Sequence, residues 1–328
     1  MALNQYLAEE VALDCAEGLV SRREALRRLG LLGLTTTAGA ALLAACGSED
    51  NSTDGVVSTD AANASTSFTT GSTASSPSST APTTAAAGGV STIVATTNAP
   101  PTTQEEIRFP GPNGDLIGVL ATAAEPLGAV LVIHENRGLT PHIRTIPARL
   151  AADGYTALAI DLLSEEGGTS ALPTEGDATA ALGNAPIERL IADLRAGLDE
   201  LVRRAPGKRL AAIGFCFGGG MTWQLLAAGE PRLAAAVPFY GPGPEQPNFS
   251  GSPNAAVLGI YAELDSRVNA SQDRMRTALE AAGLTSEIRV FPGVDHAFFN
   301  ETGSRYNAGQ AAAAYQATLA WFSVHLAT

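Results

Sequence analysis

The sequence predicts an α/β fold in which helices cover both faces of a mostly parallel central sheet. Two observations lead to this prediction: short apolar runs alternate with longer helix-like segments, and a glycine-rich turn joins one run to the segment after it. Continuous apolar runs of roughly four to eight residues are typical of strands that are buried on both faces of a parallel sheet. The runs occupy residues 129–133, 156–160, 210–213, 233–240, 255–261 and 287–291.

The segments between these runs are expected to contain the crossover helices that parallel strands require. A helix is predicted to end at Ala152, another covers 220–228, and a last one covers 308–326. The carboxyl ends of the parallel strands then share one edge of the sheet, where open α/β sheets bind their ligands.

The most informative stretch is Gly-Phe-Cys-Phe-Gly-Gly at residues 214–219, which follows the apolar run 210–213. Glycines placed two residues to either side of a central residue are typical of the nucleophile elbow of α/β-hydrolases, a sharp turn from strand to helix. Cys216 stands at the nucleophile position. The alternative is that Cys216 is a buried free thiol that packs like a small apolar side chain.

Two further residues complete a candidate catalytic triad. Asp265 follows the run that ends at 261, and His296 follows the run that ends at 291. A lone aspartate after a strand often caps a helix, and a lone histidine is often structural. The order nucleophile, acid, histidine is nevertheless that of α/β-hydrolases, so the sequence favours a triad of Cys216, Asp265 and His296.

Each residue of this triad would have a distinct chemical role. The thiolate of Cys216 would attack a carbonyl carbon, and His296 would take up a proton and return it to the leaving group. Asp265 would hold the imidazole in the correct tautomer. The Phe217 N–H, at the start of a helix, would donate to the oxyanion. A cysteine nucleophile suits activated esters or lactones.

Several motifs together resemble the dienelactone hydrolase family (carboxymethylenebutenolidases) over roughly residues 105–328. They are His-Glu-Asn-Arg-Gly-Leu at 134–139, Asp-Gly-Tyr at 153–155, Asp161, the turn at 214–219, His-Ala-Phe-Phe-Asn at 296–300 and Arg-Tyr-Asn at 305–307. The resemblance implies an α/β-hydrolase fold with a Cys-Asp-His triad. It also implies hydrolysis of an enol lactone to an open-chain keto acid through an acyl-cysteine intermediate.

The resemblance adds two site residues. It implies that Glu135 contacts the resting thiol and helps to generate the thiolate, and that the backbone N–H of Asn136 belongs to the oxyanion hole. Taken by itself, Glu135 could equally be a polar residue that ends a strand. A carboxylate beside a thiol can accept its proton if both are sheltered from water.

The chain departs from the family at the site for the substrate carboxylate. Well-known members have an arginine four residues after the catalytic histidine, where this chain has Asn300. The nearest alternatives are Arg137, Arg144 and Arg305, any of which could bind a carboxylate or could be a solvated surface charge. The sequence therefore predicts the reaction type more firmly than the substrate.

Residues 1–46 are predicted to be an export signal. Ser-Arg-Arg-Glu-Ala-Leu at 21–26 resembles a twin-arginine motif, an apolar stretch follows at 29–45, and Leu-Ala-Ala-Cys at 43–46 resembles a lipobox. Cys46 would then carry a lipid, and the protein would be exported and anchored at the outer face of the cell membrane. The alternative is a buried amphipathic helix with an incidental cysteine. Acidic residues before the arginines, at positions 9, 10, 14 and 17, are atypical of a signal.

Three parts of the chain are thus expected: the signal at 1–46, a disordered linker rich in Ser, Thr, Ala and Pro at 47–104, and the catalytic domain at 105–328. The formal net charge of −13 argues against a nucleic-acid partner. No sequence motif indicates a cofactor or a metal site.

We therefore expect a hydrolase of small activated esters or enol lactones. Two alternatives remain at the level of sequence. One is a carboxylesterase of broad specificity that accepts neutral substrates, as Asn300 suggests. The other is a lipoprotein that kept the fold but binds at the cell surface without catalysis.

Overall fold

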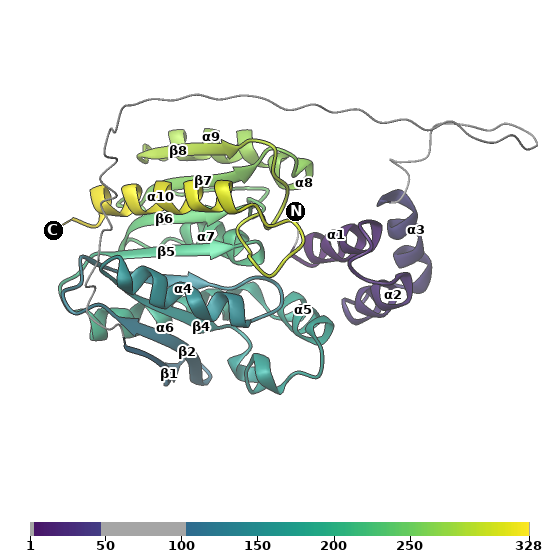
Figure 1. The fold of residues 1–328 in the computed structure, drawn as a ribbon, viewed down its shortest axis with the longest axis horizontal. Helices are drawn as coiled ribbons and strands as arrows, with labels where there is room; N and C mark the ends of the chain where they lie inside the picture. Colours follow the sequence, from purple (N-terminus) through teal and green to yellow (C-terminus); the bar gives the residue numbers. More distant parts are fainter. Residues whose placement is uncertain (1–2, 47–102, 328) are drawn as a thin grey trace, which may run out of the picture. The chain divides into compact units, whose positions relative to one another are not determined.

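The computed structural model describes residues 3–46 and 103–327. Its centre is an eight-stranded sheet with the order β1-β2-β4-β3-β5-β6-β7-β8 (Figure 1). Strand β2 runs antiparallel to both β1 and β4, and the remaining neighbours are parallel. The strands are β1 (Thr103–Gly111), β2 (Gly114–Thr122), β3 (Gly128–Ile133), β4 (Tyr155–Asp161), β5 (Leu210–Phe215), β6 (Leu233–Phe239), β7 (Ala256–Ala262) and β8 (Ser286–Phe291).

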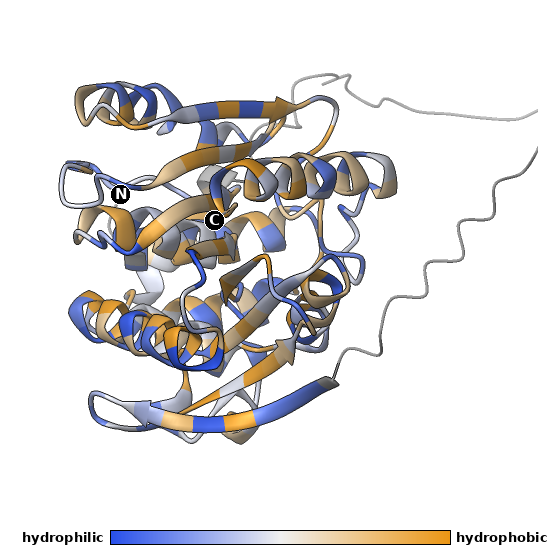
Figure 2. Cartoon of the chain, turned by 90° about the vertical axis from the view of Figure 1, so that its left-hand side faces the viewer, coloured by the Kyte–Doolittle hydropathy of each residue, from blue (hydrophilic) through white to orange (hydrophobic). Residues whose placement is uncertain are grey.

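The central strands are apolar because both of their faces are covered. Every residue of β3, β4, β5 and β7 is buried, and Figure 2 shows these strands mostly in the colours of apolar residues. Helices α4 and α10 cover one face of the sheet, and α6 and α7 cover the other (Figure 1). The described helices of this part are α4 (Pro141–Ala152), α5 (Glu175–Asn184), α6 (Ile187–Arg204), α7 (Phe217–Ala227), α8 (Ser266–Asn269), α9 (Gln272–Ala281) and α10 (Ala308–His325).

The predicted fold class is confirmed, and each predicted apolar run is a strand whose ends differ from the prediction by one or two residues. Helix α7 begins at Phe217, directly after the cysteine, as expected for a helix whose first N–H groups face the site, and three residues before the start that the apolar pattern indicated. The antiparallel hairpin of β1 and β2 was not anticipated, and neither were α5, α6 and α9.

The N-terminal segment forms three helices: α1 (Leu3–Ala16), α2 (Arg22–Leu31) and α3 (Thr36–Cys46). The apolar stretch 29–45 is therefore divided between two helices. Gly33 has a φ of 84°, which ends the first helical run, and the side chain of Thr35 accepts a hydrogen bond from the N–H of Ala38 at the start of the next.

These helices belong to the same compact unit as the residues from 103 onward. Arg27 of α2 forms an ion pair of 3.2 Å with Asp177 of α5, and Asn184 at the end of α5 donates to the carbonyl of Leu31. Within residues 3–46 and 103–327, none of the helices is both long and apolar enough to cross a bilayer. The predicted linker lies almost wholly outside the described residues.

Candidate active site

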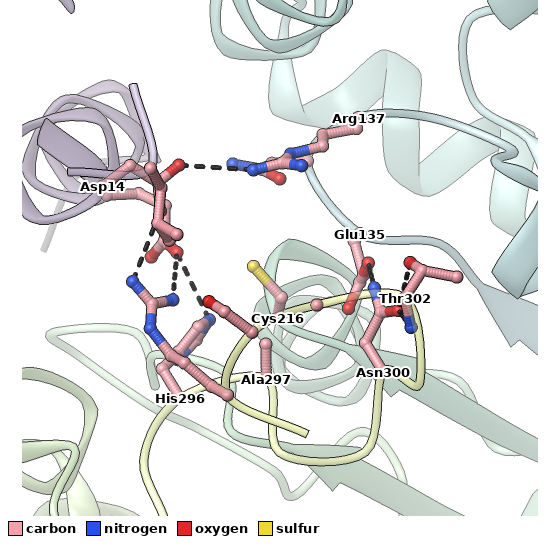
Figure 3. Close-up of a pocket in the computed structure, with 14 residues that line it drawn as sticks. Asp14, Glu135, Arg137, Cys216, His296, Ala297, Asn300 and Thr302 are labelled. Atoms are coloured by element: carbon pink, nitrogen blue, oxygen red, sulfur yellow. Dashed lines mark hydrogen bonds and ion pairs between the residues drawn. The ribbon is translucent and has the colours of Figure 1, made fainter. Parts of the chain in front are cut away.

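Cys216 occupies the turn between β5 and α7 and adopts a φ of 56°, a conformation that is uncommon for residues other than glycine. The turn is tight because its neighbours lack side chains. A Cβ on Gly214 would lie 2.0 Å from the carbonyl oxygen of Gly218, and a Cβ on Gly218 would lie 2.3 Å from that of Ile133. The thiol is thereby held at the carboxyl end of the sheet, where it lines a pocket (Figure 3).

His296 and Asp265 lie in the loops that follow β8 and β7. The Nδ1 atom of His296 is 2.6 Å from Oδ2 of Asp265, and both side chains are buried. The other oxygen of Asp265 accepts a hydrogen bond from the N–H of Val268 at the start of α8, so the carboxylate is fixed at both oxygens. This is the arrangement that orients an imidazole through its Nδ1 and leaves Nε2 for chemistry.

The Nε2 atom of His296 faces a second acidic group, because Oε1 of Glu10 lies 3.6 Å away. Burial alone would lower the pKa of His296, but the negative charges of Glu10 and Asp265 outweigh this and raise the pKa well above its usual range. These charges favour the protonated form of His296, and one of its ring nitrogens lies within 4.8 Å of the Cys216 sulfur.

Glu135 follows β3 and lines the same pocket as Cys216 (Figure 3). Its Oε2 accepts a hydrogen bond of 2.7 Å from Nδ2 of Asn300, whereas Oε1 is buried and has no hydrogen-bond partner among the described residues. Burial raises the pKa of Glu135, although the charges of His142 and Arg137 oppose this. A buried carboxylate with one unused oxygen beside a thiol is suited to accept a proton.

The two residues predicted to provide oxyanion-hole N–H groups also lie beside the thiol. Phe217 opens α7 directly after Cys216, and Asn136 lines the pocket next to Glu135. The carbonyl of Asn136 accepts a hydrogen bond from the hydroxyl of Thr179 in α5, which holds this loop in place.

The structure adds Tyr6 of α1 to this site. The Tyr6 hydroxyl lies 3.2 Å from Sγ of Cys216 and 3.5 Å from Nε2 of His296, so it bridges the two groups. Burial, and then the neighbouring Cys216 and Glu10, raise the pKa of Tyr6 well above its usual range, so its hydroxyl stays protonated.

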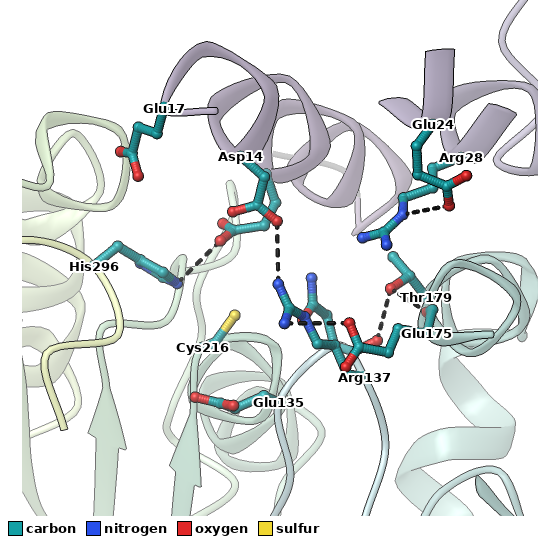
Figure 4. A network of polar contacts seen from close by, with 12 residues as sticks. Asp14, Glu17, Glu24, Arg28, Glu135, Arg137, Glu175, Thr179, Cys216 and His296 are labelled. Atoms are coloured by element: carbon teal, nitrogen blue, oxygen red, sulfur yellow. Dashed lines mark hydrogen bonds and ion pairs between the residues drawn. The ribbon is translucent and has the colours of Figure 1, made fainter. Parts of the chain in front are cut away.

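Three arginines pair with the acidic side chains of α1, and Figure 4 shows one of them, Arg137, beside Asp14. Glu10 forms an ion pair with Arg267, and the Nη2 atom of Arg305 is 3.3 Å from Asp14. Arg137 pairs with the other oxygen of Asp14, also at 3.3 Å. Burial would raise the pKa of Glu10, but the charges of His296, Arg267 and Arg305 lower it to about 2.

One group of side chains has the composition of a metal site. The ligand atoms of Glu10, Cys216 and His296 lie within 4.8 Å of one another. The carboxylate of Glu10 also faces Arg267 and Arg305, whose positive charges balance it. These charges favour the observed ion pairs over a bound cation.

Most of the predicted site residues lie together, and Arg144 lies apart from them. Cys216, His296, Glu135 and the candidate arginines Arg137 and Arg305 line one pocket with a volume of about 230 Å³, and Asn136 joins them. Arg144 lies elsewhere: it pairs with Glu106 at 2.8 Å and donates to the carbonyl of Leu139.

Sequence reasoning missed Tyr6, Glu10, Asp14 and Arg267. The spacing of Tyr6, Glu10 and Asp14 by four residues indicates that they share one face of a helix. Arg267 comes two residues after Asp265, and this proximity in sequence was the available indication that Arg267 lies near the site. Neither pattern indicates what the side chains contact.

The strand order, the turn at Cys216 and the placement of Asp265 and His296 after later strands define an α/β-hydrolase. The model of the dienelactone hydrolase family matches residues 116–326, and the chain belongs to this family. It is a hydrolase that acts on ester or lactone bonds. The match runs from β2 to the residue after α10 and does not include α1–α3.

Individual relatives agree with this assignment. A protein from Escherichia coli O157:H7, provisionally named a carboxymethylenebutenolidase, is 37% identical over 211 residues, which are 60% of this chain and 77% of that protein. One of the same provisional name from Saccharolobus solfataricus is 30% identical over 239 residues, 62% and 92% of the two chains. The crystal structure of a provisionally named dienelactone hydrolase from Klebsiella pneumoniae has a TM-score of 0.60 and 32% identity, and covers 68% of this chain and 99% of its own.

Proposed function

We propose that the enzyme hydrolyses small activated esters or enol lactones with Cys216 as the nucleophile, His296 as the acid and base, and Asp265 as the residue that orients His296. The observation that carries this proposal is the position of the three side chains after β5, β8 and β7, with His296 bonded to Asp265 at 2.6 Å.

The reaction would proceed in two halves. The Cys216 thiolate attacks the carbonyl carbon, and the electron pair of the C=O bond moves to oxygen, which the N–H groups of Phe217 and Asn136 stabilise. The intermediate collapses to an acyl-cysteine as the leaving oxygen takes a proton from His296. His296 then removes a proton from water, the hydroxide adds to the thioester, and the carboxylic acid leaves as the thiolate is restored.

Glu135 would generate the thiolate of Cys216 by accepting the proton of its thiol. Its unpartnered buried oxygen Oε1 is available for the proton of the thiol, and transfer becomes more favourable because burial has raised the pKa of the carboxyl group. In a lactone substrate, the leaving enolate remains tethered to the acyl group, so hydrolysis gives one open-chain product.

Neutral and anionic substrates are both compatible with the pocket. Arg137 and Arg305 line it and could bind a substrate carboxylate, whereas Asn300 stands where the resemblance to the family implies an arginine. A broad carboxylesterase that accepts neutral esters is therefore the second candidate.

The test is turnover of a dienelactone and of a neutral aryl ester by the full chain, with Cys216→Ala as the inactive variant and Cys15→Ala as the matched control. We expect Cys216→Ala to lose at least about a thousandfold of kcat for whichever substrate is used, since the nucleophile is gone, while Cys15→Ala keeps its activity. Turnover of the aryl ester alone would assign the broad esterase. Equal activity of Cys216→Ala and the wild type would contradict the proposed nucleophile.

We further propose that residues 1–46 direct export and that Cys46 carries the lipid that anchors the protein at the membrane surface. The sequence motifs at 21–26 and 43–46 support this. Labelling with a radioactive fatty acid in a bacterial host tests it: the label should be lost in Cys46→Ala and retained in Cys15→Ala. Labelling that persists in Cys46→Ala would contradict the proposed anchor.

A further inference from the structure

Helix α1 directs one polar face at the proposed catalytic residues. Tyr6, Glu10 and Asp14 are spaced by four residues, so their side chains follow one another along the same side of the helix. All three are buried, with exposed fractions of 1%, 4% and 4%. Figures 3 and 4 show Asp14 directed toward the cluster that contains Cys216, His296 and Arg137.

Tyr6 fills the space over the nucleophile. Its hydroxyl is 3.2 Å from the Cys216 sulfur, which is the distance from which a substrate carbonyl would be attacked. The ring is held in place by Arg267, whose guanidinium carbon lies 4.5 Å from the ring centroid. A substrate carbonyl and the Tyr6 hydroxyl therefore cannot occupy the position over the sulfur together.

The acidic side chains of α1 form ion pairs with the arginines of the site. Glu10 pairs with Arg267 and lies 3.6 Å from Nε2 of His296. Arg305 is bound by Asp14 at 3.3 Å and by Glu17 through a hydrogen bond of 2.7 Å. These contacts are those that a carboxylate of a bound acyl substrate would make with the same arginines.

We propose that α1 is an internal occupant of the substrate site, with Tyr6 in the place of the reacting carbonyl and Glu10 and Asp14 in the place of substrate carboxylates. This inference rests on the proposed function, because it takes Cys216 and His296 as the reacting groups. The enzyme is closed while α1 is docked, and it binds substrate when α1 has moved away. An anionic acyl substrate competes with α1 for Arg267 and Arg305.

The ion pairs at Glu10 make the docked state sensitive to single substitutions. Removing one partner of a buried charge pair leaves the other charge unpaired, and Arg267 would then be more stable exposed to water. Glu9 provides the matched control. It is the neighbouring carboxylate on the same helix, and it accepts a hydrogen bond from Gln5 of that helix.

The experiment measures how fast Cys216 is alkylated in the full chain, by mass spectrometry of the peptide that contains it. Neutral iodoacetamide and anionic iodoacetate are compared for the wild type, Glu10→Gln, Tyr6→Phe and Glu9→Gln. We expect Glu10→Gln to raise the rate with iodoacetamide by about tenfold or more. The rate with iodoacetate should rise further, because the freed arginines attract the anion. Tyr6→Phe should raise both rates by a smaller factor, and Glu9→Gln should leave them unchanged.

Arg267→Gln separates opening of the site from attraction by the arginine. It should raise the rate with iodoacetamide as Glu10→Gln does, with a smaller additional gain for iodoacetate, because Arg305 is freed but Arg267 is absent. Equal alkylation rates in the wild type, Glu10→Gln and Arg267→Gln would overturn the proposal.

Ester turnover, measured in the same samples, keeps this inference distinct from the proposed function. Turnover that rises together with alkylation supports both. Faster alkylation without turnover in any variant would contradict the proposed function but leave α1 as the occupant of the pocket. Loss of turnover in Glu10→Gln with unchanged alkylation would make Glu10 part of the working site and would overturn the inference.

Discussion

Asn300 forms a hydrogen bond with the side chain of Glu135. Instead of facing a substrate, its amide donates to Oε2 of Glu135, and its own oxygen accepts hydrogen bonds from the N–H and the hydroxyl of Thr302. The amide therefore stabilises the ionised form of Glu135 and lowers its pKa, against the larger effect of burial, which raises it. Asn300 thereby contributes to the ionisation of Glu135, together with the charges of His142 and Arg137.

Asn300→Leu is therefore expected to shift the pH dependence of kcat/KM. Without the amide donor the pKa of Glu135 rises further, so the ionised fraction is lost at a higher pH as the pH falls. The acidic limb of the profile should move to higher pH, and activity on that limb should fall by up to about tenfold, with little change at alkaline pH. The measurement is the pH profile of ester hydrolysis.

Thr302→Val is the control for this variant, because it removes a hydrogen bond to Asn300 but keeps the donor to Glu135. Its acidic limb should stay near that of the wild type. Identical profiles for the wild type and Asn300→Leu would show that ionisation of Glu135 does not limit the reaction.

At the scale of elements, the turn between β5 and α7 depends on close approach of the backbone. A Cβ on Gly218 would meet the carbonyl oxygens of Ile133 and His134 at 2.3 and 2.6 Å, both of them backbone atoms that cannot move aside alone. Gly218 thus allows α7 to lie against the end of β3. This contact brings Cys216 next to the loop that carries Glu135 and Asn136.

Gly218→Ala should destabilise the protein by roughly 1–3 kcal/mol and lower kcat, since α7 and β3 must separate to make room. Urea unfolding and ester turnover measure the two effects. Gly30→Ala is the matched substitution in a helix: a Cβ there meets nothing within 4 Å, so it should be neutral or stabilising by up to about 1 kcal/mol. A Gly218→Ala protein as stable and active as the wild type would contradict the argument.

Most of the strands that could be predicted are buried on both faces; the edge strand β8 is the exception. Strands β3 to β7 are continuous apolar runs, and their limits follow closely from the sequence. Strand β1 is an edge strand that includes the four exposed residues Gln104, Glu105, Glu106 and Arg108, and a polar edge strand has no apolar run to indicate it. The hairpin was therefore missed.

At the scale of the whole molecule, the residues near Cys216 were predicted because they follow strands that end at one edge of the sheet. The contribution of α1 could not be predicted in this way. Tyr6 and Cys216 are 210 residues apart, and a helical spacing shows which side chains share a face without showing what that face contacts. Glu10 and Asp14 of α1, acidic residues that are unusual in an export signal, have their partners in Arg137, Arg267 and Arg305.

The position of the proposed lipid anchor implies that α1 would be removed from the mature protein. Helices α1–α3 end at Cys46, so a signal peptidase that cuts before Cys46 would remove Tyr6, Glu10 and Asp14 in the same step. Residues 1–45 would then be both an export signal and an inhibitory propeptide. The newly made chain would be an inactive precursor. The same cleavage would mature and activate the enzyme. Because this would happen only outside the cytoplasm, the enzyme would not hydrolyse cytoplasmic esters and thioesters.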